Sequence, residues 1–414
     1  MHNSGSHAAQ VVIAKDSRLK LVRSYTFGEW GYPVTNAHHL FRMGSIAKML
    51  CAMRAVAFDD ANWLKSSIAE HFTSLHPDTP DDRAQKFQNT RVIDLLRFQS
   101  GWQPDRGDPK YLYATDVFEK RALRSDENDG VRRLPLKPGD FGLFVKGSKL
   151  DFVQHNPRTI ESYNNYEYWA AGEIVSRKRW GSGDPKRYTE AMHEFWGGGN
   201  ATGIAGLAPS LLPTRRDSLD AGEVVTRTVP AFKRATLTGD NDFPQADGGV
   251  ANWVAGAYRH GRDAEAAAGY GYFTMSAVML ARIMQGMHPD PIAPVVSLLT
   301  PTQIEWLATP NPNALATSKG VTFPSETGLG TSQKERSFAG HGALNLSKGG
   351  SMPGLQADSH LDHFIWQDGR GAPHSLTAIS VINGEVVHID GQAEALEKLG
   401  HWDDDTNLFP EFFE

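Results

Sequence analysis

Ser45 and Lys48 are three residues apart in the run Ser45-Ile46-Ala47-Lys48, at the start of a predicted helix. Residues at i and i+3 lie on one face of a helix, so the serine hydroxyl and the lysine amine are within reach of each other. A free serine hydroxyl is a poor nucleophile, but a lysine held neutral by burial and nearby cations can take its proton. The helix N-terminus adds partial positive charge that favours an alkoxide or an oxyanion. The pattern indicates nucleophilic catalysis by Ser45.

The Ser-x-x-Lys spacing alone is weak evidence for catalysis. Ser17-Arg18-Leu19-Lys20 has the same spacing, yet it falls in a predicted β-hairpin, where we expect solvated surface. Taken alone, Ser45 also fits a serine that caps a helix, beside a lysine whose amine extends to solvent. Two further motifs bear on the choice.

Tyr163-Asn164-Asn165 directly precedes a strongly predicted helix. Both outer side chains can project from a short loop into a cleft. A tyrosine near two lysines has a lowered pKa and can shuttle protons. Asn165 offers one acceptor and two donors to an amide or ester group. The alternative is a tyrosine in an ordinary helix cap.

Lys348-Gly349-Gly350-Ser351 lies on a predicted strand. Glycines inside a strand weaken it and often mark a close approach of backbone to a ligand. Lys348 would supply a fixed positive charge, and the Ser351 amide would donate to an oxyanion alongside the Ser45 amide. The alternative is a glycine-rich edge strand with a solvated lysine.

The elements that position these motifs follow from hydrophobic patterning. Residues 8–24 alternate apolar and polar around Asp16 and Ser17, which predicts a hairpin. Residues 46–58 contain no glycine or proline and are rich in Ala and Met, which predicts a helix. The middle of the chain is predicted to be mostly helical, and the last part returns to strands. The clearest further segments are helices Val92–Arg97, Tyr166–Lys178 and Met275–Met287, strands Asn345–Leu346, His363–Trp366 and Ser375–Ile382, an Asn383-Gly384 turn into a strand Glu385–Ile389, and a closing helix Gln392–Leu399.

This order of elements predicts an α/β (α+β) fold. An antiparallel sheet flanked by helices is expected from both chain ends, with an all-helical lobe inserted between them. The α/β lobe comprises residues 1–60 and 290–414, and the helical lobe residues 61–289. The helical lobe carries loop-rich insertions near 103–115 and 139–160, and the active site lies between the lobes.

The composition excludes several classes of function. With 40% hydrophobic and 22% charged residues, the 414-residue chain is globular rather than disordered. A net charge of −6 without a basic stripe argues against a nucleic-acid partner. Apolar runs such as Val295–Leu299 are far shorter than the ~20 residues of a membrane helix. A single cysteine, Cys51, and no visible signal peptide predict a cytoplasmic protein, unless a leader has been removed.

Taken in order, Ser45-x-x-Lys48, Tyr163-x-Asn165 and Lys348-Gly-Gly resemble the motifs of the serine β-lactamase-like superfamily. The resemblance is to the branch with class C β-lactamases, D,D-peptidases and family VIII carboxylesterases. It extends over roughly residues 8–390. Further matching segments are Phe41 to Ser45, Val92 to Leu96 with Ser100-Gly101, Ser162 to Tyr166, Trp169 to Val175, and Gly328-Leu-Gly330.

The resemblance implies a β-lactamase/transpeptidase-like fold and a role for each motif residue. Ser45 would form an acyl-enzyme, and Lys48 and Tyr163 would share general-base and general-acid duty. Which of the two takes the first proton is left open by the sequence. No metal and no cofactor is implied. The other implied roles are substrate binding by Asn165, Lys348, Gly349 and Gly350, and an oxyanion hole from the amides of Ser45 and Ser351.

The sequence departs from the family pattern at two motifs. The third motif usually reads Lys-Thr-Gly or His-x-Gly, so Gly349 removes one polar contact to a substrate carboxylate. The usual His-Thr-Ser-Gly is Phe98-Gln99-Ser100-Gly101 here. By analogy the two insertions sit at the mouth of the cleft. Their aromatic side chains either line an acyl pocket or hold a loop in place: Trp102, Tyr111, Tyr113, Phe141 and Phe144.

We therefore expect a serine hydrolase that cleaves an ester or amide of a small molecule. An acyltransferase would use the same residues, with an alcohol or amine in place of water. A β-lactamase or D,D-peptidase is a further alternative, disfavoured by the missing leader and by Gly349. An inactive binding protein of the same fold is disfavoured because Ser45, Lys48, Tyr163 and Lys348 are all present.

Overall fold

The computed structural model describes most of the chain, with gaps, and the statements below concern the described residues. These are 8–26, 34–72, 75, 78–103, 141–142, 145, 150–181, 185–196, 226–227, 253–254, 269–271, 273–291, 295–311, 313–318, 321–324, 327–338, 341–352 and 357–383.

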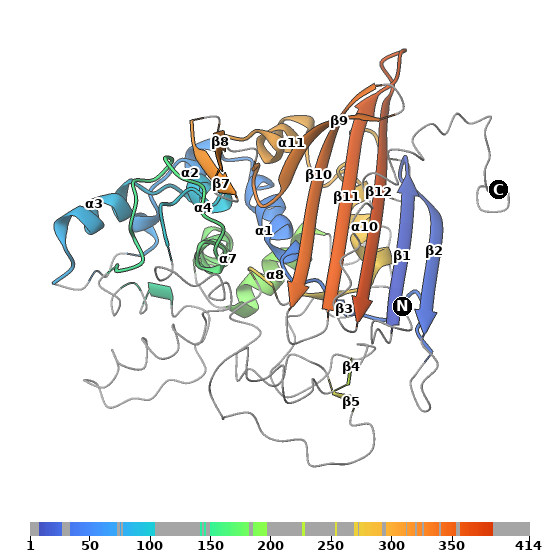
Figure 1. The fold of residues 1–414 in the computed structure, drawn as a ribbon, viewed down its shortest axis with the longest axis horizontal. Coiled ribbons are helices and arrows are strands. Elements are labelled where there is room, and N and C mark those ends of the chain that lie inside the picture. The colour runs from blue at the N-terminus through green and yellow to red at the C-terminus, as the bar shows by residue number, and fades with distance from the viewer. Residues whose placement is uncertain are drawn as a thin grey trace.

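A six-stranded antiparallel sheet joins the two ends of the chain (Figure 1). Its strand order is β2-β1-β12-β11-β10-β9, and β1 pairs with β2 on one side and with β12 on the other. The sheet expected from both chain ends is therefore confirmed. The sheet strands are β1 (Ala8–Lys15), β2 (Arg18–Thr26), β9 (Ser332–Phe338), β10 (His341–Met352), β11 (Ala357–Gln367) and β12 (Pro373–Asn383).

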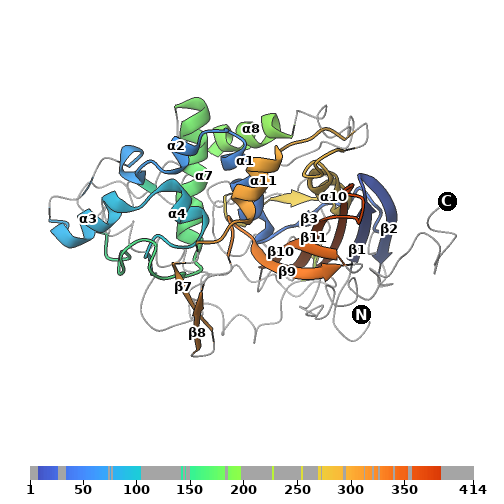
Figure 2. The ribbon, with the colours of Figure 1, turned by 90° about the horizontal axis from the view of Figure 1, so that it is seen from above.

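The helices lie against one side of this sheet or beyond it (Figures 1 and 2). Helix α1 lies between the sheet and the helices of the opposite side of the molecule, in contact with β10 and α7. Helix α10 packs on β1 and β12. The helices are α1 (Ile46–Val56), α2 (Ala61–Leu64), η2 (Ile68–Glu70), α3 (Asp81–Asn89), α4 (Val92–Leu96), α7 (Asn165–Trp180), α8 (Pro185–Phe195), α10 (Ala277–Gln285) and α11 (Pro301–Ala308).

Helix α1 is buried along its whole length, Lys48 and Arg54 included. Apart from these two, all its residues are apolar, and a helix that is apolar nearly all round belongs in the interior of a protein. Its small and flexible side chains allow close packing against several elements at once. The residues that carry the Ser-x-x-Lys motif are therefore held by the most buried helix of the described chain.

The hairpin at the start of the chain forms as expected. Asp16 and Ser17 both have positive φ, 46° and 65°, as a two-residue hairpin turn requires. The prediction that the Ser17 motif is solvated surface is wrong for Ser17, which is buried. Arg282 of α10 donates to its carbonyl at 3.3 Å, because α10 packs over this end of the sheet.

Several other boundaries differ from those predicted. The helix expected from Met275 begins at Ala277, because β6 (Thr274–Met275) pairs with β3 (Phe41–Arg42). The strand expected at 345–346 is part of the twelve-residue β10, which is paired with β11 through the glycines. Strand 385–389 and helix 392–399 lie outside the described residues. Short pairs also form between β4 (Thr226–Arg227) and β5 (Trp253–Val254), and between β7 (Leu315–Ser318) and β8 (Val321–Pro324).

The aromatic residues of the two predicted insertions divide between described and undescribed segments. Trp102 and Phe141 are fully buried and stack with ring centroids 5.7 Å apart. These two therefore hold a loop in place rather than line an open pocket. Tyr111, Tyr113 and Phe144 lie outside the described residues. The division of the chain at residues 60 and 289 stays a prediction. Helix α10 falls within the range predicted for the helical lobe, 61–289, and it lies against the sheet.

No helix among the described residues is long and apolar enough to cross a membrane.

Candidate active site

Ser45 is held at the N-terminal end of α1 by a tight turn. Gly44 has φ 51°, a left-handed conformation that glycine adopts at no steric cost. Ser45 is the N-cap residue, yet its hydroxyl makes no capping hydrogen bond. Its Oγ contacts Lys48 and Tyr163 instead. The geometry thus disagrees with the alternative in which Ser45 only caps the helix.

Lys48 points back along α1 toward this hydroxyl. Its Nζ lies 3.0 Å from Ser45 Oγ and donates to the Tyr270 carbonyl at 2.8 Å. Burial, and secondarily the positive charge of Lys348, lower the pKa of Lys48 well below its ordinary value. The amine is therefore neutral more readily than an exposed lysine, as a general base must be.

Tyr163 reaches the same hydroxyl from the loop that precedes α7. Its phenol oxygen lies 2.6 Å from Ser45 Oγ, although the two residues are 118 positions apart. Tyr163 is 38% exposed, so it is more accessible than Lys48 and Lys348. Lys48 Nζ lies 5.0 Å from its ring centroid. Ser45 is thus contacted by two groups that can exchange protons with it.

Lys348 approaches from β10 on the inner face of the sheet. Its Nζ lies 5.0 Å from the ring centroid of Tyr163 and 5.2 Å from that of Phe98. Burial lowers the pKa of Lys348 to about 8, and the carboxylate of Glu161 opposes this shift. The ammonium is nearly buried and stands beside the reacting groups, so its charge acts on them with little screening.

Gly350 allows β10 to pass directly beside the turn that carries Ser45. A Cβ on Gly350 would overlap the carbonyl oxygen of Met43 and lie 2.5 Å from Ser359 Oγ. The Ser359 hydroxyl donates to the Met43 carbonyl at 2.8 Å and so ties β11 to the same turn. Gly349 differs from Gly350: it is exposed, and a Cβ there would meet nothing within 4 Å.

Among the described residues, the C-terminal end of β10 is paired on one side only. Its pairing with β9 ends at Ser347, whereas its pairing with β11 continues to Met352. Ser351 lies on this stretch, opposite Asp358 of β11. Among the described residues, none accepts a hydrogen bond from the backbone N–H of Ser45. The two residues whose amides are expected to form an oxyanion hole thus lie on elements that pack against each other, Ser45 at the start of α1 and Ser351 near the end of β10.

A buried polar network supports the loop that holds Tyr163. Asn164, the N-cap of α7, accepts from the Glu167 amide at 3.0 Å and donates to the Ser162 carbonyl at 2.8 Å. Glu167 accepts hydrogen bonds from both the amide and the hydroxyl of Ser100. Burial raises the pKa of the Glu167 carboxyl well above its ordinary value. Glu167 therefore links α7 to the segment after α4.

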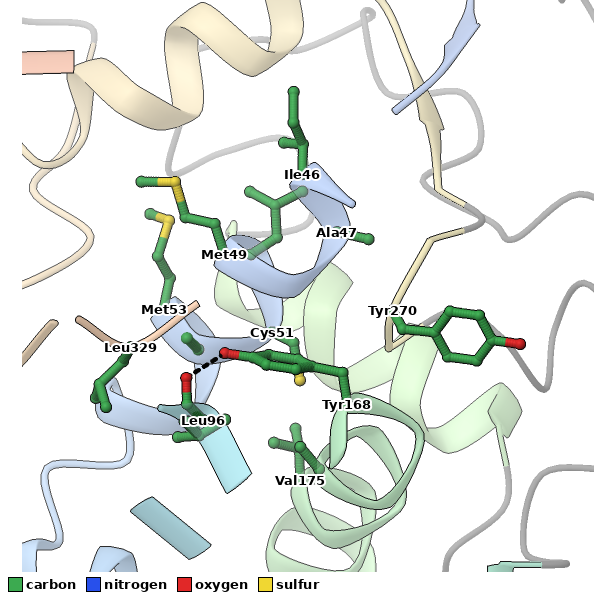
Figure 3. Packing of buried hydrophobic residues seen from close by; sticks show 14 of the residues in the cluster. Ile46, Ala47, Met49, Cys51, Met53, Leu96, Tyr168, Val175, Tyr270 and Leu329 are labelled. Atoms are coloured by element: carbon green, nitrogen blue, oxygen red, sulfur yellow. Dashed lines mark hydrogen bonds between the residues drawn. The ribbon is translucent and has the colours of Figure 1, made fainter. Parts of the chain in front are cut away.

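The first half of α1 is fixed by equally close packing (Figure 3). The Tyr168 hydroxyl donates to the Leu96 carbonyl at 2.7 Å, and its ring lies over Cys51. Gly330, with φ 68°, passes so close that a Cβ would lie 2.8 Å from the Lys48 carbonyl oxygen and 2.6 Å from the Tyr168 hydroxyl. The Gly-Leu-Gly segment noted in the sequence is thus packed against the nucleophile helix.

The structure brings Ser45, Lys48, Tyr163 and Lys348 together. Asn165 is half-buried in the first turn of α7, two residues after Tyr163, and its substrate contact stays a prediction. The described residues contain no cluster of three or more side chains suited to bind a metal ion.

Two contributors to the site were missed by sequence reasoning. Tyr270 supplies a backbone carbonyl, which every residue type possesses, so no sequence signal could have identified it. The sequence marks Phe98 only as a departure from the motif it resembles, yet the centroid of its ring lies 4.6 Å from the ring centroid of Tyr163.

Comparison with known proteins agrees with this architecture. No protein-family model matches the sequence, and no curated protein matches it significantly. The structure is similar to that of a β-lactamase/D-alanine carboxypeptidase from Yersinia pestis, with 14% identity, a TM-score of 0.54, and coverage of 96% of this chain and 93% of the other. It is similar to a class C β-lactamase, with 12% identity, a TM-score of 0.53, and coverage of 96% and 92%.

A D-amino acid amidase from Ochrobactrum anthropi is also similar, with 14% identity, a TM-score of 0.52, and coverage of 95% and 91%. At these identities the comparison establishes the fold. The chain has the fold of the serine β-lactamase/transpeptidase-like superfamily, as the resemblance in its sequence led us to expect.

Proposed function

We propose that this protein is a serine hydrolase that cleaves an ester or amide of a small molecule through an acyl-enzyme on Ser45. The observation that carries the proposal is the contact of one hydroxyl with two proton-transfer groups. Ser45 Oγ lies 3.0 Å from Lys48 Nζ and 2.6 Å from the Tyr163 phenol. This is the arrangement that an activated nucleophile requires.

In the acylation step, Lys48 is the first base, because burial lowers its pKa and makes the neutral amine more accessible. A serine hydroxyl has one proton and can donate only one hydrogen bond. When Tyr163 donates to Ser45 Oγ, the serine proton is directed to Lys48, whose neutral amine still donates to the Tyr270 carbonyl. Ser45 Oγ then attacks the substrate carbonyl carbon while its proton moves to Lys48 Nζ.

The leaving group departs with a proton supplied by Tyr163. Lys48 then passes the serine proton to Tyr163 through a water molecule, because Ser45 Oγ is an ester oxygen in the acyl-enzyme and cannot relay it. A water molecule then repeats the sequence against the acyl carbonyl: it gives up a proton, releases the carboxylic acid and regenerates the Ser45 hydroxyl. The positive charge of Lys348 stabilises the anionic forms that arise in both steps.

The backbone near the Ser45 hydroxyl suits a developing oxyanion. The Ser45 amide lies at the N-terminal end of α1, where the helix dipole adds positive potential. The Ser351 amide lies on the stretch of β10 that β9 leaves uncovered. Together these amides would hold the oxyanion, and the same open edge would receive the part of the substrate next to the scissile bond.

The third motif bears on the class of substrate. Gly349 is exposed and offers no hydroxyl to a substrate carboxylate, which favours esters and amides without that group over penicillins. The structural neighbours include a D-amino acid amidase, which supports amides as candidates. Transfer of the acyl group to an alcohol or amine would use the same residues and remains the alternative. Retention of all four polar groups weighs against an inactive binding protein.

The proposal is tested by turnover of a panel of small p-nitrophenyl esters and p-nitroanilides. Acid quenching followed by intact-mass measurement should show an acyl adduct that Ser45→Ala lacks. Ser17→Ala is the matched control, because Ser17 has the same Ser-x-x-Lys spacing outside the site. Added alcohol or amine separates hydrolysis from transfer by product mass. Turnover that persists in Ser45→Ala would exclude the mechanism.

A further inference from the structure

Helix α4 ends in a capping motif with an unusual residue at its critical position. The Gln99 amide donates to the Asp94 carbonyl at 2.8 Å, and the Phe98 amide to the Leu95 carbonyl at 3.1 Å. These two bonds define a Schellman cap, in which the residue after the C-cap adopts a left-handed conformation. That residue is Phe98, with φ 58°.

This conformation disfavours a side chain, and a bulky one most of all. Glycine usually occupies the position because it has no Cβ. The cap itself therefore gives no reason for a phenylalanine. Such outliers persist where the surroundings require them, and they gather at functional sites.

The surroundings show what the ring does. Phe98 is 1% exposed, and its ring centroid lies 4.6 Å from that of Tyr163 and 5.1 Å from that of Tyr168. Lys348 Nζ lies 5.2 Å from the same ring, within the range of a cation–π contact. The ring thus touches both Tyr163 and Lys348, two of the four polar groups of the site.

The backbone of Phe98 acts on the same loop. Its carbonyl accepts from the Ser162 amide at 2.8 Å, which fixes the residue immediately before Tyr163. The left-handed turn directs the carbonyl to this loop and the ring to the phenol. The ring and the backbone carbonyl of Phe98 therefore both act on the position of Tyr163.

We propose that Phe98 is a positioning residue of the active site, whose ring sets the phenol of Tyr163 against Ser45 and seats the ammonium of Lys348 beside it. The inference rests on the proposed function, because it concerns the groups that activate Ser45. It goes beyond that function because Phe98 is apolar and lies outside the three polar motifs, yet it is assigned control of the rate of the chemical step. It also gives a physical reason for a side chain at a position that glycine would occupy without strain.

The test measures covalent inactivation by a fluorophosphonate over a range of concentrations and pH, which separates the maximal rate from the binding constant. Phe98→Leu keeps the backbone strain and the apolar burial but removes the ring face. A displacement of about 1 Å in a reacting group costs up to ~100-fold in rate, so we expect a 10- to 100-fold lower maximal rate with a nearly unchanged binding constant. Phe98→Gly relieves the strain yet should be equally slow.

Two controls separate positioning from a general loss of structure. Phe87→Leu removes another fully buried ring, one that stacks on Trp102 at 6.0 Å, and should leave the maximal rate within about threefold of wild type. Phe98→Tyr keeps the ring face and should restore most of the rate. The basic limb of the pH profile, which reports Lys348, should shift in Phe98→Leu and not in Phe87→Leu.

Each result has a distinct meaning. A slow Phe98→Leu beside a normal Phe87→Leu supports the positioning role. Wild-type rates in Phe98→Leu, or equal losses in both leucine variants, overturn it while leaving the proposed function intact. Absence of labelling in the folded wild-type protein overturns the proposed function, and this inference with it.

Discussion

Replacing Gly350 by alanine places a methyl group between β10 and the turn that carries Ser45. The added Cβ would overlap the Met43 carbonyl oxygen, and it would lie 3.0 Å from the Met43 carbonyl carbon and 2.5 Å from Ser359 Oγ. Ordinary contacts of carbon with oxygen are about 3.3–3.6 Å. The turn or the strand must therefore move by roughly 1 Å, and neither is a flexible side-chain end that can rotate away.

The expected consequences are a loss of stability and a larger loss of rate. Overpacking at a tightly packed contact costs about 1–3 kcal/mol. A 1 Å displacement of a nucleophile from its base reduces the rate by up to ~100-fold. We therefore expect Gly350→Ala to lower the melting temperature and to slow fluorophosphonate labelling of Ser45 by 10- to 100-fold.

Gly342→Ala is the matched control on the same strand. It lies eight residues away, and a Cβ there would meet nothing within 4 Å. Replacing a glycine inside a strand by alanine gains roughly 0.5–1 kcal/mol, so this variant should melt at the wild-type temperature or slightly above and label at the wild-type rate. Equal behaviour of Gly350→Ala and Gly342→Ala in both assays would refute the close approach of β10 to the Ser45 turn.

Three further predictions concern the titratable groups. Lys48→Met should lower the rate of fluorophosphonate labelling by about 100-fold or more. It should raise the melting temperature, because it removes a fully buried amine. The labelling rate should fall above about pH 8, where Lys348 loses its charge, and Lys348→Arg should move this fall to higher pH because a guanidinium stays protonated. Glu167 has a raised pKa, so its contribution to stability is complete below the ordinary carboxyl pKa of about 4.3 and is lost as pH rises toward the folded value. Glu167→Gln should therefore lose less stability than wild type between pH 5 and pH 8 in denaturant titrations, and an identical loss in both proteins would contradict a buried protonated carboxyl.

The sequence could predict those parts of the site that depend on local spacing or on the order of motifs. Ser45 and Lys48 come together because residues three positions apart on a helix lie on the same face. The contact of Tyr163 with Ser45 spans 118 positions, and only the resemblance to a known motif order indicated it. Tyr270 contributes a carbonyl, and a backbone group has no sequence signature.

Tertiary contacts explain the remaining differences. The helix expected from Met275 begins two residues later because Thr274 and Met275 pair with β3. The glycines of β10 weaken a strand locally, yet β11 pairs with them throughout, so the strand predicted at 345–346 and the one predicted at 348–351 are parts of one longer strand. Phe98 adopts a conformation that its residue type disfavours, because contacts from Tyr163 and Lys348 hold its ring.

The central claim is that Ser45 is an activated nucleophile, and intact mass after incubation with a fluorophosphonate tests it most directly. The account predicts a single adduct on the wild-type protein and none on a folded Ser45→Ala variant. An adduct that persists in Ser45→Ala, or a folded wild-type protein that takes up no label, would contradict it.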